Sequence, residues 1–202
     1  MLFTPIKMNQ YNKVAIYGGS FNPVHTGHIL TCLSVLENTD YNHIFFIPAY
    51  QPSHKNLIND PGFSHRLNMI KLAIEGINGI SVNDIEGLKG GVSYTAETLR
   101  YFKSNFTNIT NYGIIIGDDL LDGLNSWKDF DYLSSNSEFI ILTRNGNKYN
   151  GTIPIQYVKN RIIEISSTEI RSRIATGKTI KYLVPDKVID YIQNHNLFNG
   201  DK

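Results

Sequence analysis

Short apolar runs alternate along this chain with longer stretches in which apolar residues recur every three or four positions. The short runs are typical of buried strands and stand at 14–17, 44–47, 80–85, 112–116, 139–142 and 162–165. Between them, helical periodicity groups Leu33 with Leu36 and Leu99 with Phe102. Strands that alternate with helices predict right-handed βαβ units. We therefore expect an α/β fold with a parallel sheet of about six strands between two layers of helices.

Residues with special backbone preferences predict where several elements begin and end. Asp60 and Pro61 suit the N-cap and first position of a helix, and Ser93 or Thr95 suits the cap of a later one. The stretch 87–91 predicts a flexible turn, and the helical pattern over 120–133 is broken near Gly123. In the helix that follows residue 60, Arg66 and Lys71 are expected to face solvent or a ligand.

The C-terminal part, 166–202, predicts a small helical segment. Ser166 followed three residues later by Glu169 fits a capping box, Gly177 ends that helix, and 186–194 form a short final helix. Residues 1–12 read as a loose lead-in. We interpret 1–202 as a single domain, since 202 residues suit one folding unit.

The composition excludes several classes of protein. Lys and Arg number 19 against 18 Asp and Glu, so the net charge of +1 gives no reason to expect nucleic acid as a partner. No apolar run reaches the roughly 18 residues of a membrane span, so we expect no membrane partner and a cytoplasmic location. The single cysteine, Cys32, cannot form an internal disulfide and is predicted to lie in the core. The sequence leaves open whether the chain forms a homo-oligomer.

The stretch 14–29, VAIYGGSFNPVHTGHI, carries the main candidate site. Gly18 and Gly19 directly follow a strand and predict a sharp turn that brings backbone N–H groups close to a ligand. His25 and His28 then stand at the start of a helix, where free N–H groups and the helix dipole favour a phosphate. The alternative interpretation is that the two imidazoles only satisfy the turn.

Other polar groups also follow predicted strands directly: 48–55, Gly117 with Asp118, Arg144, and 166–171. Ligands of parallel sheets bind beyond the carboxyl ends of the strands, so these segments are expected to share one site. Arg171 lies one helical turn beyond the hydroxyls of Ser167 and Thr168, within reach of the same anion.

Several stretches of the chain resemble the bacterial nicotinate mononucleotide adenylyltransferases of the HxGH nucleotidylyltransferase superfamily. They are GGSFNPVHTGH, PSHK, SYTAETL, IIGDD with a later Trp, LTRNG, and ISSTEIRSRI with a later YLVPDKVIDYI. The first and last are shared across adenylyl- and cytidylyltransferases, whereas 93–95 and Trp127 indicate the pyridine nucleotide branch. Glu97 departs from the family, which usually has Asp before Thr-Leu.

The resemblance implies a Rossmann-like three-layer αβα fold and the conversion of ATP and nicotinate mononucleotide into nicotinate adenine dinucleotide and pyrophosphate. It implies His25, His28 and Arg171 as catalytic residues. For ATP it implies Gly18, Gly19, Ser20, Phe21, His28, Gly117, Asp118, Ile165, Ser167, Thr168 and Arg171. For the mononucleotide it implies Asn22, Lys55, Tyr94, Thr95, Trp127 and Arg144. No residue is expected to bind a metal directly, and Mg²⁺ would be carried on the ATP phosphates.

Three rival interpretations remain open at this point. The first is a preference for nicotinamide mononucleotide, and the second is another superfamily activity that makes a coenzyme A or lipid precursor. The third is a non-catalytic nucleotide sensor on the same fold. Single residues also have plainer interpretations: Trp127 can be a core residue, and Lys55 and Arg144 can be solvated surface charges.

Overall fold

In the computed structural model, which describes residues 11–53, 57–143, 146–159 and 163–199, a six-stranded parallel sheet forms the centre of the molecule. Its order is β4-β2-β1-β6-β7-β8. The strands are β1 (Lys13–Gly19), β2 (His43–Pro48), β4 (Ile80–Val82), β6 (Asn111–Gly117), β7 (Glu138–Thr143) and β8 (Ile155–Lys159). The predicted α/β fold with a parallel sheet of about six strands is confirmed.

The order of the strands reverses between β1 and β6. From β1 the chain moves outward to β2 and β4, and then returns to β6 on the other side of β1 before continuing to β7 and β8. The connections after β1 and β6 therefore run to opposite sides and leave a crevice at the carboxyl ends of these strands. Two candidate glycine motifs of the sequence, 18–28 and 117–118, begin at this crevice.

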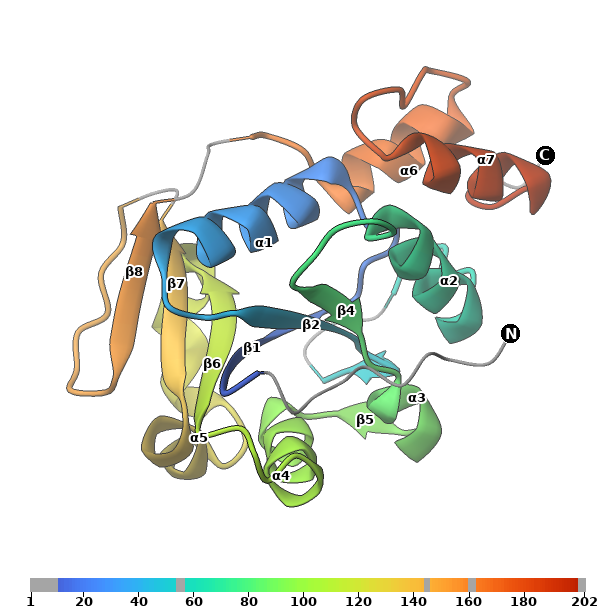
Figure 1. Cartoon of the computed structure of the whole chain (residues 1–202). Coiled ribbons are helices and arrows are strands. Elements are labelled where there is room, and N and C mark those ends of the chain that lie inside the picture. Colours follow the sequence, from blue (N-terminus) through green and yellow to red (C-terminus); the bar gives the residue numbers. More distant parts are fainter. Residues whose placement is uncertain (1–10, 54–56, 144–145, 160–162, 200–202) are drawn as a thin grey trace.

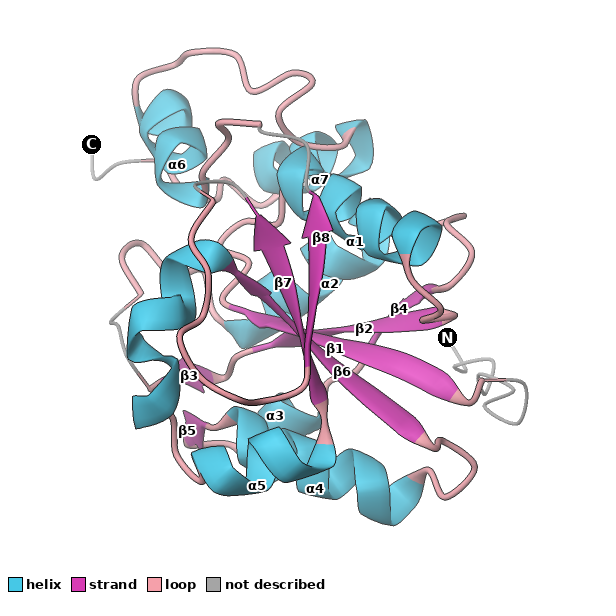
Figure 2. Ribbon diagram, turned by 90° about the vertical axis from the view of Figure 1, so that its left-hand side faces the viewer, coloured by secondary structure: helices cyan, strands magenta, loops and turns pink. Residues whose placement is uncertain are grey.

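Helices cover both faces of the sheet (Figure 1). One face carries α1 (Thr26–Asn38) and α2 (Phe63–Ala73), with α6 (Ser167–Ala175) and α7 (Asp186–Asn194) beside them. The other carries α4 (Thr95–Asn105), the 3₁₀ helix η2 (Asp118–Ser126) and α5 (Phe130–Asn136). Figure 2 shows the twisted strands between these layers, with α6 and α7 at the top and α4 and α5 at the bottom.

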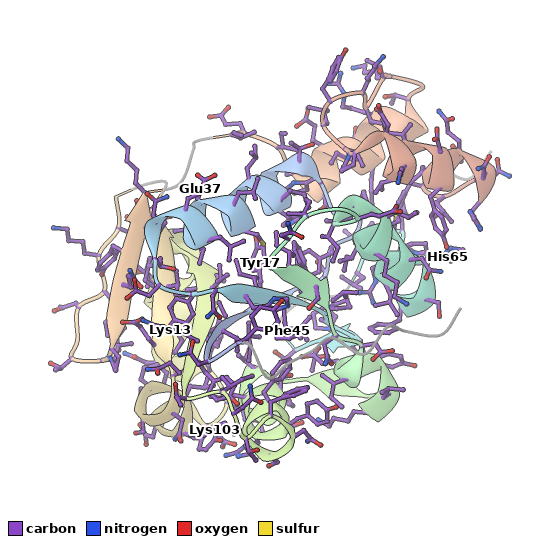
Figure 3. The ribbon with its side chains drawn as sticks, in the orientation of Figure 1. Lys13, Tyr17, Glu37, Phe45, His65 and Lys103 are labelled. Carbon is purple, nitrogen blue, oxygen red and sulfur yellow. The ribbon has the colours of Figure 1, made fainter. Side chains whose placement is uncertain are left out.

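The strands are apolar throughout because both of their faces are covered. In β1, Ala15 and Tyr17 pack in the core under α1, whereas Val14 and Ile16 pack in the core under α4. Figure 3 shows Tyr17 near α1, with Phe45 of β2 on the opposite side of the sheet. Cys32 is fully buried in the α1 layer, as predicted. This alternation explains why continuous apolar runs, and not alternating ones, marked the strands.

Several predicted boundaries are wrong. The last strand is β8 and ends at Lys159, and residues 163–165 form no strand. The strand predicted over 80–85 ends at Val82, and the short helix α3 (Ile85–Lys89) overlaps the first part of the turn predicted over 87–91. An unpredicted two-stranded sheet joins β3 (Gln51–Pro52) to β5 (Val92–Ser93). These elements are too short for periodicity to reveal them.

Two predicted helix caps are also wrong, whereas the third is confirmed. The N-cap of α2 is Gly62, and Asp60 instead accepts hydrogen bonds from the Gly62 amide (3.1 Å) and from Arg66 Nε (2.9 Å). The N-cap of α4 is Tyr94, whose side chain caps no amide. Ser166 caps α6 as predicted and accepts the Glu169 amide at 3.1 Å.

His43, at the start of β2, is buried and gives the fold a predicted pH dependence. Its ring lies 4.2 Å from the Tyr11 ring and 4.6 Å from the Phe45 ring, and Nε2 lies 2.7 Å from Ser81 Oγ. Burial lowers the pKa of His43 from its ordinary value of 6.5 to about 4. As the pH falls below 6.5, His43 becomes protonated in the unfolded chain, whereas its imidazole in the folded protein stays neutral until about pH 4.

The contribution of His43 to stability is therefore complete above pH 6.5 and decreases as the pH falls towards 4, by up to about 3 kcal/mol. The free energy of unfolding, measured with urea between pH 7.5 and 5, should decrease in this way for the wild type. In His43→Gln it should depend less steeply on pH. His195→Gln, at an exposed histidine after α7, is the control and should retain the wild-type slope. An unchanged slope in His43→Gln would exclude His43 as the titrating group.

Candidate active site

The loop between β1 and α1 has a different geometry from the predicted glycine turn. Gly18 and Gly19 still belong to β1, where they pair with Ile47 and Pro48. The turn residue is Phe21, whose φ of 46° is left-handed. A Cβ on Gly19 would lie 2.8 Å from the Phe21 ring, so Gly19 is required to make room for that ring and not to turn the chain.

His25 and His28 lie together at the start of α1. His25 is the N-cap and is buried, and His28, at the third helical position, accepts the His25 amide N–H at Nδ1 (3.1 Å). The two rings stack with their centroids 3.6 Å apart, and the Phe21 ring meets His28 edge-on at 5.0 Å. Because Nδ1 accepts a hydrogen bond, the proton of neutral His28 is on Nε2, which is thus a donor.

Part of the predicted phosphate cradle at α1 is used by the protein itself. The Thr26 amide donates to Leu183 O (2.9 Å), and the Thr26 hydroxyl donates to Tyr182 O (3.1 Å). These bonds attach the chain before α7 to the start of α1. The donors that the start of α1 offers to a ligand are therefore mainly the imidazoles of His25 and His28, and not a row of free backbone amides.

Helix α6 packs against the same loop from the C-terminal side. Ser167 Oγ donates to Pro23 O at 2.8 Å, and Arg171 Nη1 donates to Asn22 O at 2.7 Å. Arg171 Nη2 also donates to Thr168 Oγ1 at 3.2 Å. Partial burial lowers the pKa of Arg171 below its ordinary value, but a guanidinium remains charged at neutral pH.

These groups surround an open cleft of about 450 Å³, a size typical of small-molecule sites. Its lining joins the end of β1, the start of α1, the segment before α2 and the start of α6. The lining residues are Tyr17, Gly18, Gly19, Ser20, Phe21, Asn22, His25, His28, Leu57, Ile58, Ile165, Ser166, Ser167, Thr168 and Arg171. The lining residues that the structure describes are therefore rich in hydrogen-bond donors, and they include one permanent cation and no carboxylate.

Two residues predicted to contact ATP do not line this cleft: Gly117 is the last residue of β6, and Asp118 follows it at the switch point. Asp118 is buried and connects β6 to a neighbouring turn: its Oδ2 accepts the Gly146 amide at 3.0 Å, and its backbone carbonyl accepts Asn147 Nδ2 at 3.4 Å. In this structure Asp118 thus holds the segment that follows β7.

The residues predicted for the mononucleotide are distributed over several elements. Asn22 lines the cleft and donates from Nδ2 to Ile58 O at 3.1 Å. Tyr94 and Thr95 lie at the start of α4 outside the cleft, and Trp127, which follows η2, is half-buried against the core under α4. The core interpretation of Trp127 is thus partly correct. Lys55 and Arg144 lie outside the described residues.

Around Glu97, the start of α4 carries more positive than negative charge. Glu97, in the first turn, accepts Lys128 Nζ at 2.7 Å and also pairs with Lys89. Lys128 Nζ lies 4.1 Å from the centre of the Tyr94 ring. Two ammonium groups therefore offset the one carboxylate beside Thr95, so an anion would meet little repulsion there.

Comparisons with known proteins identify the family of this chain. A model of the cytidylyltransferase-like family matches residues 16–173. A probable nicotinate-nucleotide adenylyltransferase of Borrelia garinii subsp. bavariensis is 35% identical over 187 residues, covering 92% of this chain and 94% of the relative. One from Clostridium botulinum is 36% identical over 197 residues, covering 91% and 98%. The chain belongs to the nicotinate-nucleotide adenylyltransferase family.

A solved structure supports the same conclusion for the fold. The nicotinic acid mononucleotide adenylyltransferase of Plasmodium falciparum, complexed with NaAD, superposes with a TM-score of 0.74 at 26% identity, over 95% of this chain and 99% of that one. Among the described residues no helix is long and apolar enough to cross a membrane.

Two features of this family member were missed by the sequence reasoning. Leu57 and Ile58 add apolar surface to the cleft, and Ile58 is largely exposed. Arg66, expected to face solvent or ligand, is completely buried. The one available signal was its helical position, three before Met69 and four before Ile70, which are both buried core residues on the same face.

Proposed function

We propose that the protein transfers the adenylyl group of ATP to nicotinate mononucleotide by direct in-line attack of the mononucleotide phosphate on the α-phosphate. The products are nicotinate adenine dinucleotide and pyrophosphate. The observation that carries this proposal is the cleft in which His25, His28, Ser167, Thr168 and Arg171 converge. No activated nucleophile is required, because the attacking phosphate oxygen is already anionic. The protein contributes positioning and neutralisation of charge.

Each side of the cleft has a role in this proposal. His28 donates from Nε2 to the α-phosphate, where negative charge moves during transfer, and His25 supports the neighbouring phosphates. Ser167, Thr168 and Arg171 hold the β- and γ-phosphates that leave as pyrophosphate. Gly18, Gly19, Ser20, Phe21 and Ile165 form the walls for the nucleoside. For Gly117 and Asp118, which lie outside the cleft, contact with the ribose stays a prediction.

Mg²⁺ fits this donor set only as part of the substrate. Within the described part of the chain, the lining residues provide hydroxyls, imidazoles and a guanidinium, but no carboxylate. The ion would therefore arrive on the phosphate oxygens of ATP, with water completing its coordination shell. The charge on the metal would then add to that of Arg171 in neutralising the leaving pyrophosphate.

Release of pyrophosphate tests the proposed function and its rivals together. Purified protein is mixed with Mg²⁺, ATP and, in turn, nicotinate mononucleotide, nicotinamide mononucleotide and 4′-phosphopantetheine. We expect rapid release with the first only. Release with the third alone would indicate a coenzyme A precursor activity, and release with none would indicate a nucleotide sensor.

Arg171→Ala should raise the KM for ATP by roughly 10- to 100-fold, because a charge-assisted hydrogen bond contributes about 1.5–3 kcal/mol. The KM is measured at saturating mononucleotide. Arg171→Lys should recover only part of the loss, since an ammonium cannot form two parallel bonds to phosphate. Arg173→Ala, on the same helix but outside the cleft, is the control. An unchanged KM in Arg171→Ala would remove Arg171 from the triphosphate site.

A further inference from the structure

Arg66 of α2 is the largest side chain in the fully buried set, and its guanidinium joins segments that are far apart in the sequence. Nη1 donates to Ser20 O at 2.9 Å and to Ala49 O at 2.8 Å. Nη2 donates to Tyr50 O at 3.2 Å, and Nε donates to Asp60 Oδ1 at 2.9 Å. One planar cation thus fixes the carbonyls that follow β1 and those that follow β2.

The two joined segments belong to different halves of the proposed site. Ser20 lines the cleft and begins the loop that leads to His25 and His28. Tyr50 connects to the proposed mononucleotide half: its amide donates to Ser93 Oγ at 2.9 Å. The next two residues form β3, which pairs with β5, so that Pro52 lies opposite Ser93. The residues that follow β5 are Tyr94 and Thr95 at the start of α4.

The contacts around the guanidinium make this link rigid. Its central carbon lies 5.6 Å from the centre of the Phe63 ring, and that ring lies 5.7 Å from the Tyr50 ring. A Cβ on Gly87 of α3 would clash with the Phe63 ring, so α3 packs closely against it. Arg66 therefore has no room to change its position without moving both loops.

From this geometry we propose that Arg66 is a positioning residue that sets the ATP half of the site in register with the mononucleotide half. It contacts neither substrate. The inference rests on the proposed function, in which an oxygen of one substrate must be aligned with the α-phosphorus of the other. In such a reaction a displacement of one half-site by about 1 Å can reduce turnover by about 10²-fold.

Arg66→Lys is the decisive variant, because it retains the buried charge beside Asp60 but cannot reach four acceptors on three segments. We expect kcat to fall by about 10²-fold, while the KM of each substrate, measured at saturation of the other, changes less than about threefold. Arg100→Lys is the matched control. Arg100 lies on the outside of α4, where it pairs with Asp129 at 2.7 Å, and its variant should have wild-type kinetics.

A second variant tests the same link at a half-exposed position. Ser93→Ala removes the hydroxyl that accepts the Tyr50 amide, and should lower kcat less than Arg66→Lys, again with little change in either KM. If both residues act through one chain of contacts, the fold reduction of kcat in the double variant should be smaller than the product of the fold reductions in the two single variants. If Arg66→Lys does not fold, Ser93→Ala alone tests the proposal: a lowered kcat with unchanged KM values supports it, and an unchanged kcat contradicts it.

The positioning role would be overturned if either variant had a normal kcat and a raised KM. It would also be overturned if the loss of kcat only matched the unfolded fraction measured by circular dichroism. Independent, multiplicative effects of the two variants would overturn it as well. If the wild type itself releases no pyrophosphate from ATP and nicotinate mononucleotide, the proposed function fails. An active wild type with an equally active Arg66→Lys overturns this inference alone.

Discussion

His28→Ala should lower kcat by about 10²–10³-fold and leave the KM of ATP nearly unchanged, because losing one donor to developing charge has this typical effect. The reason lies in the hydrogen bond from the His25 amide to His28 Nδ1, which keeps the proton on Nε2. His28 is half-buried in the cleft wall and packs against Phe21, so its ring is held in place before the substrate binds. Such preorganised donors act chiefly in the transition state.

Steady-state kinetics with saturating mononucleotide measure this effect, and thermal unfolding shows whether the variant is folded. His195→Ala is the control, since His195 is exposed and lies outside the cleft, where its ring stacks on Tyr191 and meets the His65 ring edge-on. A His28→Ala variant within a few-fold of the wild-type kcat would exclude the proposed donor role. A large rise in KM with normal kcat would assign His28 to binding instead.

Nicotinate mononucleotide should exceed nicotinamide mononucleotide in kcat/KM by at least about 10²-fold, because sites built for a polar group strongly reject an analogue that mismatches it. The proposed discriminating element is the start of α4 at Thr95. The side chain of the N-cap residue, Tyr94, accepts no hydrogen bond from the first turn, and the Glu97 amide donates to Tyr94 O, so the proposed donors to a ligand are the amides of Thr95 and Ala96. Two lysines offset Glu97 there, and the helix dipole favours an anion. The carboxamide of nicotinamide mononucleotide would instead direct its NH₂ group towards these N–H donors, and the donors would be left unpaired.

Two variants separate recognition of the carboxylate from stacking. Thr95→Ala should narrow the gap between the two mononucleotides, because it removes a hydroxyl at the helix start. Trp127→Ala should weaken both alike, because an indole stacks on either ring with similar energy. Equal efficiency of the wild type on both substrates would contradict the proposed charge preference. A Trp127→Ala effect confined to one substrate would show that Trp127, and not Thr95, discriminates.

Much of the fold was predictable because its causes are local. Apolar runs of strand length become buried strands wherever helices cover both faces, as in β1 and β6. The serine and glutamate at 166 and 169 form their predicted cap because both groups lie within one turn of backbone. The same local logic found the His25–His28 pair and the Ser167–Arg171 segment, which the structure brings into one cleft.

The errors share a different cause. Asp60 looked like a helix cap, but it accepts a hydrogen bond from Arg66, and the helix begins at Phe63 instead. Gly19 looked like a turn residue, but its missing side chain accommodates the Phe21 ring, which takes the left-handed turn conformation itself. In both cases the deciding partner is another side chain that folding brings into contact, and residue preferences alone do not specify that contact.

The sequence by itself therefore determined the alternation of the main strands and helices, the family and the chemical nature of the candidate phosphate-binding groups. Only the tertiary structure decided which of those groups meet. Periodicity and capping are encoded within a few residues, whereas the acceptors of Arg66 come from segments that precede it by 46, 17, 16 and 6 positions. A buried guanidinium is stable only where folding assembles such acceptors around it, and no local pattern records that they will be there.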